Sequence, residues 1–152
     1  MLFRSTTLGK VVDLAIVKSE TNAKNWFFVD RLRGAGNSLF SNGTSAEQSL
    51  TDGVSGFDIN TGFKIGAGYS ADGTNTSGQT YVDYSIARSP SFMDVVCYTG
   101  TGSATTFSHN LGVAPELIIV KQRNTTRNWA VYSATAGNTK YLILNKIGRA
   151  HV

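Results

Sequence analysis

The carboxylate side chains are few, and their spacing argues against an active site. Hydrolysis of a glycosidic bond needs two carboxyl groups flanking that bond, roughly 5 to 10 Å apart. On a strand, such a pair would usually occupy positions i and i+2 or i+4, which share a face. Glu20, Glu47 and Glu116 are the only glutamates in the chain, and none has a carboxylate partner at either spacing. The sequence therefore disfavours a glycoside hydrolase.

Other catalytic or metal-binding patterns are also missing from the sequence. His109 is the only histidine outside the last seven residues, which excludes a cluster of histidine ligands. The run Asp72–Asn75 offers oxygen ligands but lacks the alternating acids and final glutamate of a calcium loop. There is no phosphate-binding glycine loop and no nucleophile elbow. We expect no enzymatic activity, no catalytic residue, no bound metal and no cofactor.

Cys97 is the only cysteine, so the chain cannot form an internal disulfide. It lies in an apolar stretch, and a reactive thiol would need a nearby cation or helix N-terminus, neither of which the sequence indicates. Side chains alternate between the two faces of a strand. We therefore predict that Cys97, Val95 and Met93 share one buried face and that Asp94 lies on the other.

A repeat organises the chain. When the sequence is shifted by 103 positions without a gap, 11 of the 35 residues from 8 to 42 are identical to their counterparts. The matches include Ile16-Val-Lys18 on Ile119-Val-Lys121, and the Asn-Trp pair ending at Trp26 on the pair ending at Trp129. Similarity at a fixed period is typical of a repeated structural unit. We predict that residues 14–39 and 117–142 form superposable sets of strands, with the two tryptophans in matching places.

Short alternating or apolar runs separated by turn residues predict strands throughout the repeat. The 16 glycines and the 16% of charged residues also suit a β protein with many turns. The fold class expected is all-β, an antiparallel sandwich of the jelly-roll or lectin-like kind. The expected strands are Val11–Lys18, Trp26–Asp30, Ser38–Ser41, short strands marked by Phe57, Ile59, Phe63 and Ile65, Tyr81–Ala87, Phe92–Tyr98, Ala104–Phe107, Leu117–Lys121, Trp129–Ser133 and Tyr141–Leu144.

Two pairs of residues allow both a functional and a structural interpretation. Trp26 and Trp129 could stack on sugars, but their shared repeat position favours a place in the sandwich core. Asp30 and Arg33 could be a catalytic or ligand-binding pair, but we favour an ion pair that shapes the turn before Gly34. The second unit has Ser133 and Ala136 at those positions, so the unit does not depend on the pair.

The two ends of the chain do not match the repeat. Residues 1–5 and 146–152 resemble translated sequencing adapters. The alternative is a natural basic tail, but both ends match at once, so we interpret them as artefacts of an environmental fragment. The chain carries 14 basic and 10 acidic residues, and without Arg4, Lys146 and Arg149 there are 11 against 10. The charge therefore does not indicate nucleic-acid binding. The expected domains are residues 6–91, a first unit without its opening hairpin, and residues 92–145, a second unit without its C-terminal part.

Three stretches of the second unit carry a family resemblance: Ser108–Lys121, Asn128–Tyr132 and Lys140–Asn145. They resemble a domain found in bacteriophage tail and tail-fibre-like virion proteins, often in tandem and associated with concanavalin-like, lectin-type β-sandwiches. In the first unit, Lys18, Asp30–Gly34 and Ser41-Asn42 fit the same pattern. The resemblance covers about residues 8–145. It supplies no catalytic residue, and Thr6 stands where the second unit has His109.

The resemblance implies a structural and adhesive module of a virion tail, assembled after synthesis in the host cytoplasm. Its expected partners are other tail subunits, a further copy of itself and glycans of the host surface, without nucleic acid. No apolar run approaches the roughly 20 residues that a membrane helix needs, so membrane insertion is not expected. The alternatives are a carbohydrate-binding or adhesin repeat of a secreted bacterial protein, and a lectin-like domain of a glycosidase.

Loops are where a rigid sandwich usually presents a binding surface. The candidate is the polar stretch Ser70–Gln79, which we weigh against a merely solvated connection. The ligand-binding residues expected there and at its edges are Tyr69, Asp72, Asn75, Gln79 and Tyr81.

Overall fold

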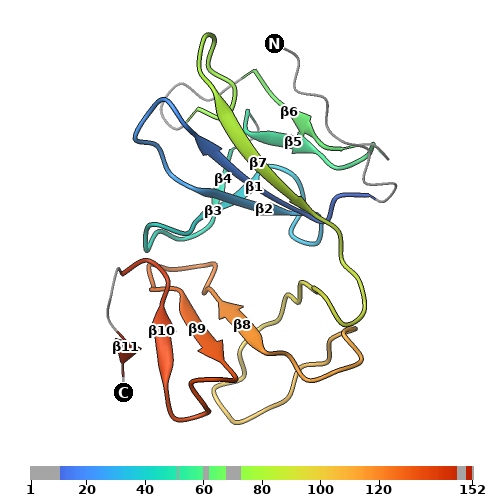
Figure 1. Cartoon of the computed structure of the whole chain (residues 1–152), viewed down its shortest axis with the longest axis vertical. Coiled ribbons are helices and arrows are strands. Elements are labelled where there is room, and N and C mark those ends of the chain that lie inside the picture. The colour runs from blue at the N-terminus through green and yellow to red at the C-terminus, as the bar shows by residue number, and fades with distance from the viewer. Residues whose placement is uncertain (1–10, 51, 60–61, 68–72, 147–149, 152) are drawn as a thin grey trace.

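The computed structural model of the chain describes residues 11–50, 52–59, 62–67, 73–146 and 150–151. These residues form strands, turns and loops, and every strand pairing among them is antiparallel (Figure 1). The predictions of an all-β chain and of antiparallel sheets are therefore confirmed. The strands are β1 (Leu14–Ser19), β2 (Phe27–Asp30), β3 (Asn37–Phe40), β4 (Gln48–Ser49), β5 (Val54–Gly56), β6 (Lys64–Ile65), β7 (Tyr81–Ile86), β8 (Leu117–Val120), β9 (Ala130–Ser133), β10 (Tyr141–Ile143) and β11 (Ala150–His151).

The first unit, β1 to β7, is built on a five-stranded sheet in the order β4-β3-β2-β1-β7. β1 and β2 form a hairpin in which Leu14 lies opposite Asp30 and Val17 lies opposite Phe27. The whole of β1 also pairs with β7, from Leu14 opposite Ile86 to Ser19 opposite Tyr81. β1 is therefore an inner strand, which agrees with its apolar side chains on both faces.

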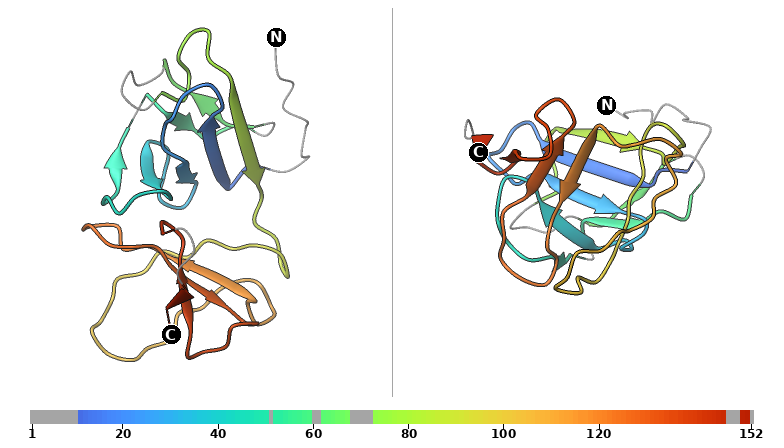
Figure 2. Two further views of the ribbon diagram at one scale, coloured as in Figure 1. Left: turned by 60° about the vertical axis from the view of Figure 1, so that its left-hand side comes forward. Right: turned by 90° about the horizontal axis from the view of Figure 1, so that it is seen from below.

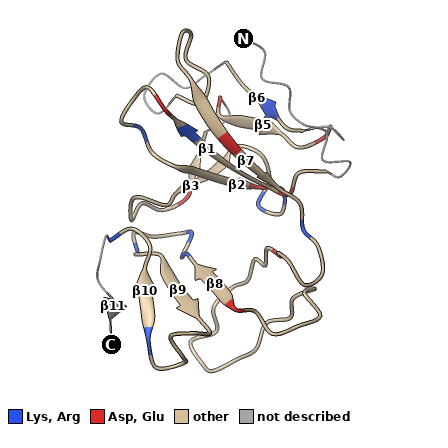
Figure 3. Ribbon diagram, in the orientation of Figure 1, with Lys and Arg blue, Asp and Glu red and all other residues tan. Residues whose placement is uncertain are grey.

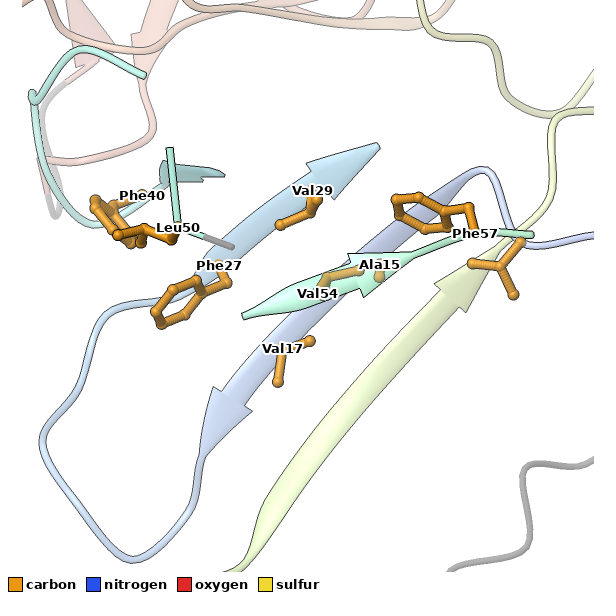
Figure 4. Packing of buried hydrophobic residues seen from close by; sticks show 9 residues of the cluster. Ala15, Val17, Phe27, Val29, Phe40, Leu50, Val54 and Phe57 are labelled. Carbon is orange, nitrogen blue, oxygen red and sulfur yellow. The ribbon is translucent and has the colours of Figure 1, made fainter. Parts of the chain in front are cut away.

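The hydrophobic core lies between one face of this sheet and the small sheet β5-β6. Alternation along β1 sends Ala15 and Val17 to that face, where both are buried. Val54 and Phe57 reach the same cluster from β5 and the residues just after it (Figure 4). Full burial of each such aliphatic or aromatic side chain stabilises the fold by about 1.5–3 kcal/mol. The other buried members are Val12, Phe27, Val29, Phe40 and Leu50.

The second unit, β8 to β11, is a four-stranded sheet in the order β11-β10-β9-β8. Its pairings reproduce those of the first unit at a spacing of 103 residues. Leu117 lies opposite Ser133 as Leu14 lies opposite Asp30, and Ala130 lies opposite Ile143 as Phe27 lies opposite Phe40. The match extends to β11, because Tyr141 and His151 pair as Ser38 and Gln48 do. The predicted superposable strand sets are confirmed by this common register.

Residues 87–116 join the two sheets, and here the strand prediction was wrong. The expected strands Phe92–Tyr98 and Ala104–Phe107 do not form, and the only pairing is an isolated bridge between Ser89 and Met93. The segment is held by polar contacts instead, since the Asp94 carboxylate accepts the N–H groups of Val95 and Asn110 at 2.9 and 2.8 Å. Without a neighbouring strand, alternating residue types do not produce alternating burial.

The second unit meets the first through the tips of its strands (Figures 1 and 2). The β8–β9 loop runs beside the loop between β3 and β4, and two backbone hydrogen bonds join them. The Glu47 N–H donates to the Arg123 carbonyl at 2.7 Å, and the Arg127 N–H donates to the Thr44 carbonyl at 2.9 Å. All four residues of β8 remain exposed.

Candidate binding site

An asparagine side chain fixes the start of the second strand in each unit. The Asn42 side-chain oxygen accepts the Trp26 N–H at 3.0 Å, and its amide nitrogen donates to the Asn25 side chain at 2.8 Å. In the second unit, Asn145 makes the same two bonds, at 2.9 Å each, to Trp129 and Asn128. We call this arrangement the Asn bridge. It sets where each tryptophan leaves the backbone, so the predicted matching places are confirmed.

The two indole rings nevertheless have different surroundings. Trp129 is only 4% exposed, its ring lies 5.4 Å from that of Phe28, and its indole N–H donates to the Phe40 carbonyl at 2.9 Å. Trp26 is half-buried and outside the core cluster. The expectation of a core position was therefore wrong for Trp26. The reason is that Trp129 is covered by the first sheet, and no described sheet covers Trp26 in the same way.

Trp26 lies instead on the outer face of the first sheet, beside Tyr84. Their rings are stacked, with centroids 6.4 Å apart and planes inclined by 23°. Ile16 lies directly opposite both Phe28 and Tyr84, and directly opposed residues share a face. The sheet thus brings side chains from β1, β2 and β7 onto one apolar surface.

This surface floors a hollow of about 370 Å³ that the second unit closes on one side with Leu144. We call it the Trp26 hollow; its lining residues are Ile16, Trp26, Phe28, Ser41, Asn42, Tyr84 and Leu144. Among the described residues, no hydrogen bond engages the indole N–H of Trp26 or the Tyr84 hydroxyl. The hollow therefore combines aromatic faces with polar groups at its edges, and no carboxylate is among its described lining residues.

The loop residues expected to bind a ligand are placed differently. Tyr69 and Asp72 lie outside the described residues. Asn75 donates to the Gly66 carbonyl at 2.9 Å, and the Tyr81 hydroxyl accepts the Thr76 N–H at 3.0 Å. The Gln79 side chain accepts from Thr21 at 2.5 Å and from Asn22 at 2.6 Å. The three described residues hold loops in place and do not line the hollow, so their binding role stays a prediction.

The sequence contains one signal for the hollow, the residue type of Trp26, but the polar loop 70–79 is the more obvious candidate. The residue type of Trp26 suggests stacking on sugars, whereas Tyr84 is one residue of an alternating strand. The two side chains share a face because β1 lies between β2 and β7. That order is a property of the sheet and cannot be read from either strand alone.

A charged network joins the two units next to the hollow. The Arg33 side chain pairs with Asp30 and donates to the Phe28 carbonyl at 2.8 Å, which confirms the predicted turn-shaping ion pair. Glu47 accepts from Arg33 at 2.9 Å and from Arg123 of the second unit at 2.7 Å. Burial raises the pKa of Glu47, but hydrogen bonds from the two arginines outweigh it, so the pKa lies below its ordinary value of 4.5. The network therefore operates with a charged carboxylate near neutral pH.

The remaining reactive side chains in the described part of the chain form no second site. Cys97 is exposed, so the prediction of a buried Cys97 was wrong. Its segment has no described neighbouring strand, so the alternation of residue types does not produce alternating burial. His109 lies in the same segment, and its Nδ1 accepts the Leu111 N–H at 3.2 Å. Within the described residues, no three histidine, cysteine or acidic side chains gather as a metal site. Basic side chains are spread over both units in the part drawn in colour (Figure 3).

Among the described residues, no helix has the length and hydrophobicity to cross a membrane.

Comparison with known proteins identifies the family to which the chain belongs. Neither a curated protein nor a solved structure matches the chain. One family, described as a domain of unknown function, DUF7483, matches residues 3–92 and again residues 85–151. The two matches overlap by a few residues, and together they span nearly the whole sequence. They agree with the common strand register of the two units. The chain therefore belongs to the DUF7483 family of domains of unknown function.

Proposed function

We propose that this chain is a non-enzymatic structural and adhesive module of a bacteriophage tail or tail fibre, and that it contacts glycans of the host surface. Each repeat is a two-layer, lectin-like β-sandwich in this proposal, and tandem repeats join other virion subunits. The observation that carries the adhesive role is the stacked pair Trp26 and Tyr84 on the floor of the Trp26 hollow. The virion context rests on the resemblance of the repeat motifs to tail proteins.

The chemistry of the hollow suits a saccharide. A sugar ring has an apolar face of C–H groups and a rim of hydroxyls, so it binds where aromatic faces adjoin polar groups. Tyr84 is 51% exposed and its hydroxyl has no described partner, which leaves both its ring face and its polar tip available. The Ser41 hydroxyl adds a further donor and acceptor at the same opening.

The size of the hollow supports a short contact and not a deep one. Its volume of about 370 Å³ lies at the lower end of the roughly 300–1,000 Å³ of ligand pockets, and it is open to solvent. A shallow site of this kind binds a single sugar weakly. Several copies displayed on one fibre would raise the overall affinity, by as much as about 10²–10⁴-fold, because the later contacts become intramolecular.

A glycan array probed with a multimerised form of the chain tests the proposal. Tyr84→Ala and Trp26→Ala, made separately, should each lower binding at least tenfold, since each removes one face of the stacked pair. Phe92→Ala is the matched control, because Phe92 is a 71% exposed aromatic residue that does not line the hollow. The variant Asp72→Ala with Asn75→Ala tests the alternative loop site.

The outcomes separate the two sites and the function itself. Loss of binding only in the loop variant would transfer the site to Ser70–Gln79. Equal binding by the Tyr84, Trp26 and control variants would eliminate the hollow. If the multimer binds no glycan at all, the adhesive role is wrong and a purely structural role remains.

A further inference from the structure

The corresponding faces of the two sheets differ in how well they are covered. Ala15 and Val17 of β1 are 0% and 3% exposed. Their counterparts at the 103-residue spacing, Ile118 and Val120 of β8, are 40% and 39% exposed. All four residues are apolar, and the pairing to the next strand has the same register. The difference therefore lies in what covers the face and not in how the sheet is built.

The first unit shows which elements provide the cover. Val54 and Phe57, from β5 and the turn that follows, pack on Ala15 and Val17 in one cluster (Figure 4). β7 pairs with β1 along its full length and closes the edge of the sheet. In the second unit, β8 pairs with β9 alone among the described residues, so both the face and the edge lack their counterparts.

Such an edge is unfavourable in water. All four residues of β8, Leu117 to Val120, are exposed and apolar, and no described strand bonds the outward backbone N–H and C=O groups. An exposed, hydrophobic edge strand is a template for pairing with another strand. Proteins usually shorten, charge or cover such edges, and β8 carries no charged residue.

We propose that the free edge of β8 and the adjoining face of β8–β10 form a docking surface for one kind of segment, namely a polypeptide with the pattern of residues 50–86. Its last strand pairs with β8 as β7 pairs with β1. Its hairpin lays apolar side chains, at the positions of Val54, Phe57 and Ile65, on the face that contains Ile118 and Val120. The first unit is the template for both contacts.

The side-chain sizes on the second sheet also indicate how the docked segment differs from residues 50–86. The opposed pair Val17 and Phe27 becomes Val120 and Ala130, which removes bulk at that level of the face. The pair Ala15 and Val29 becomes Ile118 and Tyr132, which adds bulk one pair along. Because interiors are close-packed, the docked segment should carry larger side chains over Ala130 and smaller ones over Ile118.

The test keeps all 152 residues and appends the proposed segment. Position 152 is the counterpart of Ser49 at the repeat spacing, so a copy of residues 50–86 is joined directly after Val152. Hydrogen exchange read by mass spectrometry follows the outward amides of β8. We expect their exchange to slow at least tenfold in the extended protein. The control is the same extension with Val54→Asp and Phe57→Asp in the appended copy, which should leave β8 exchange unchanged.

A second extended protein guards against a misfit caused by the redistributed bulk. It combines the appended copy with Ile118→Ala, Ala130→Phe and Tyr132→Val in the second sheet, which restores the first unit's pattern. Its β8 amides should be protected more than those of the simple extension. Unchanged β8 exchange in both extended proteins overturns the proposal. Protection of β8 in the unextended chain that rises with protein concentration also overturns it, because a second copy would then be the occupant.

Discussion

The two units share a backbone plan but differ in burial. In the first unit, nine buried hydrophobic residues form one cluster between two sheets. In the second, only Trp129, Val131 and Ile143 are buried among the described hydrophobic residues. Strand order and register are nevertheless the same wherever both units have the strand. Local residues therefore set the order and register of the strands, and the layer packed on a sheet determines how much of that sheet is buried.

Several residues that are identical in both units shape the backbone. Asn42 and Asn145 form the two Asn bridges. The side chains of Lys18 and Lys121 donate to the carbonyl of the next residue, at 2.6 and 2.7 Å, and to a carbonyl of the hairpin loop. Gly34 and its counterpart Gly137 adopt φ angles of +93° and +81°. Non-glycine residues rarely adopt such angles, so both turns favour glycine. Core residues such as Phe27 and Ala130 are free to differ.

The largest effect expected separates the two tryptophans. Trp129→Ala removes a buried ring, its contact with Phe28 and its bond to the Phe40 carbonyl, and should lower the free energy of unfolding by about 3–5 kcal/mol. Trp26→Ala removes a half-buried ring and should cost only about 1–2 kcal/mol. Urea denaturation followed by circular dichroism measures both. Equal losses would contradict the different surroundings described for the two rings.

The next effect concerns the contact between units. Glu47→Gln removes the charge that holds Arg33 and Arg123 together and should cost about 1–2 kcal/mol at pH 7. The folded pKa of Glu47 lies below its unfolded value, so this stabilisation is complete above about pH 4.5 and is lost as pH falls through the folded pKa. The difference between the two proteins should therefore shrink in acid.

The control for this effect is Glu20→Gln, because Glu20 is exposed and is the counterpart of Arg123 in the first unit. It should change stability little at any pH. A Glu47→Gln difference that stays constant from pH 7 to pH 3 would mean that the carboxylate charge is not what holds the units together.

A smaller effect tests the equivalence of the two Asn bridges. Asn42→Ala and Asn145→Ala each remove the acceptor of a tryptophan N–H and the contact with a second asparagine. Each should cost about 1 kcal/mol, since the net value of a hydrogen bond is about 0.5–1.5 kcal/mol. Thermal unfolding of the two variants gives the comparison. A large loss for one and none for the other would show that the bridge is structural in only one unit.

The sequence predicted the repeated hairpins well because their signals are local. The run Ile16-Val-Lys18, the Asn-Trp pair and Gly34 all act within a few residues of one another, so they work the same way in both units. The predicted strand of Cys97 failed for the opposite reason. Its alternation needed a neighbouring strand, and no local signal shows whether that neighbour is present.

The candidate site was harder to predict because it depends on strand order and on the second unit. Trp26 and Tyr84 are 58 positions apart and meet only because β1 lies between their strands. Leu144 closes the hollow from the other unit, at a position where the repeat has Ser41. Composition pointed to the polar loop 70–79, because polar loops often bind ligands, but composition carries no information about which strands are neighbours.

The smallest effect on stability is expected at Cys97, in the connecting segment that separates the two units. Cys97 is exposed, and Tyr98 beside it stacks on Phe107 at 3.9 Å within the same segment. A thiol reagent should therefore modify Cys97 in the native protein nearly as fast as in the protein unfolded in urea. The modified protein should keep its unfolding midpoint, because no buried contact is lost. If the native thiol instead reacts many times more slowly, or modification lowers the midpoint, then residues 93–97 pack as a buried strand.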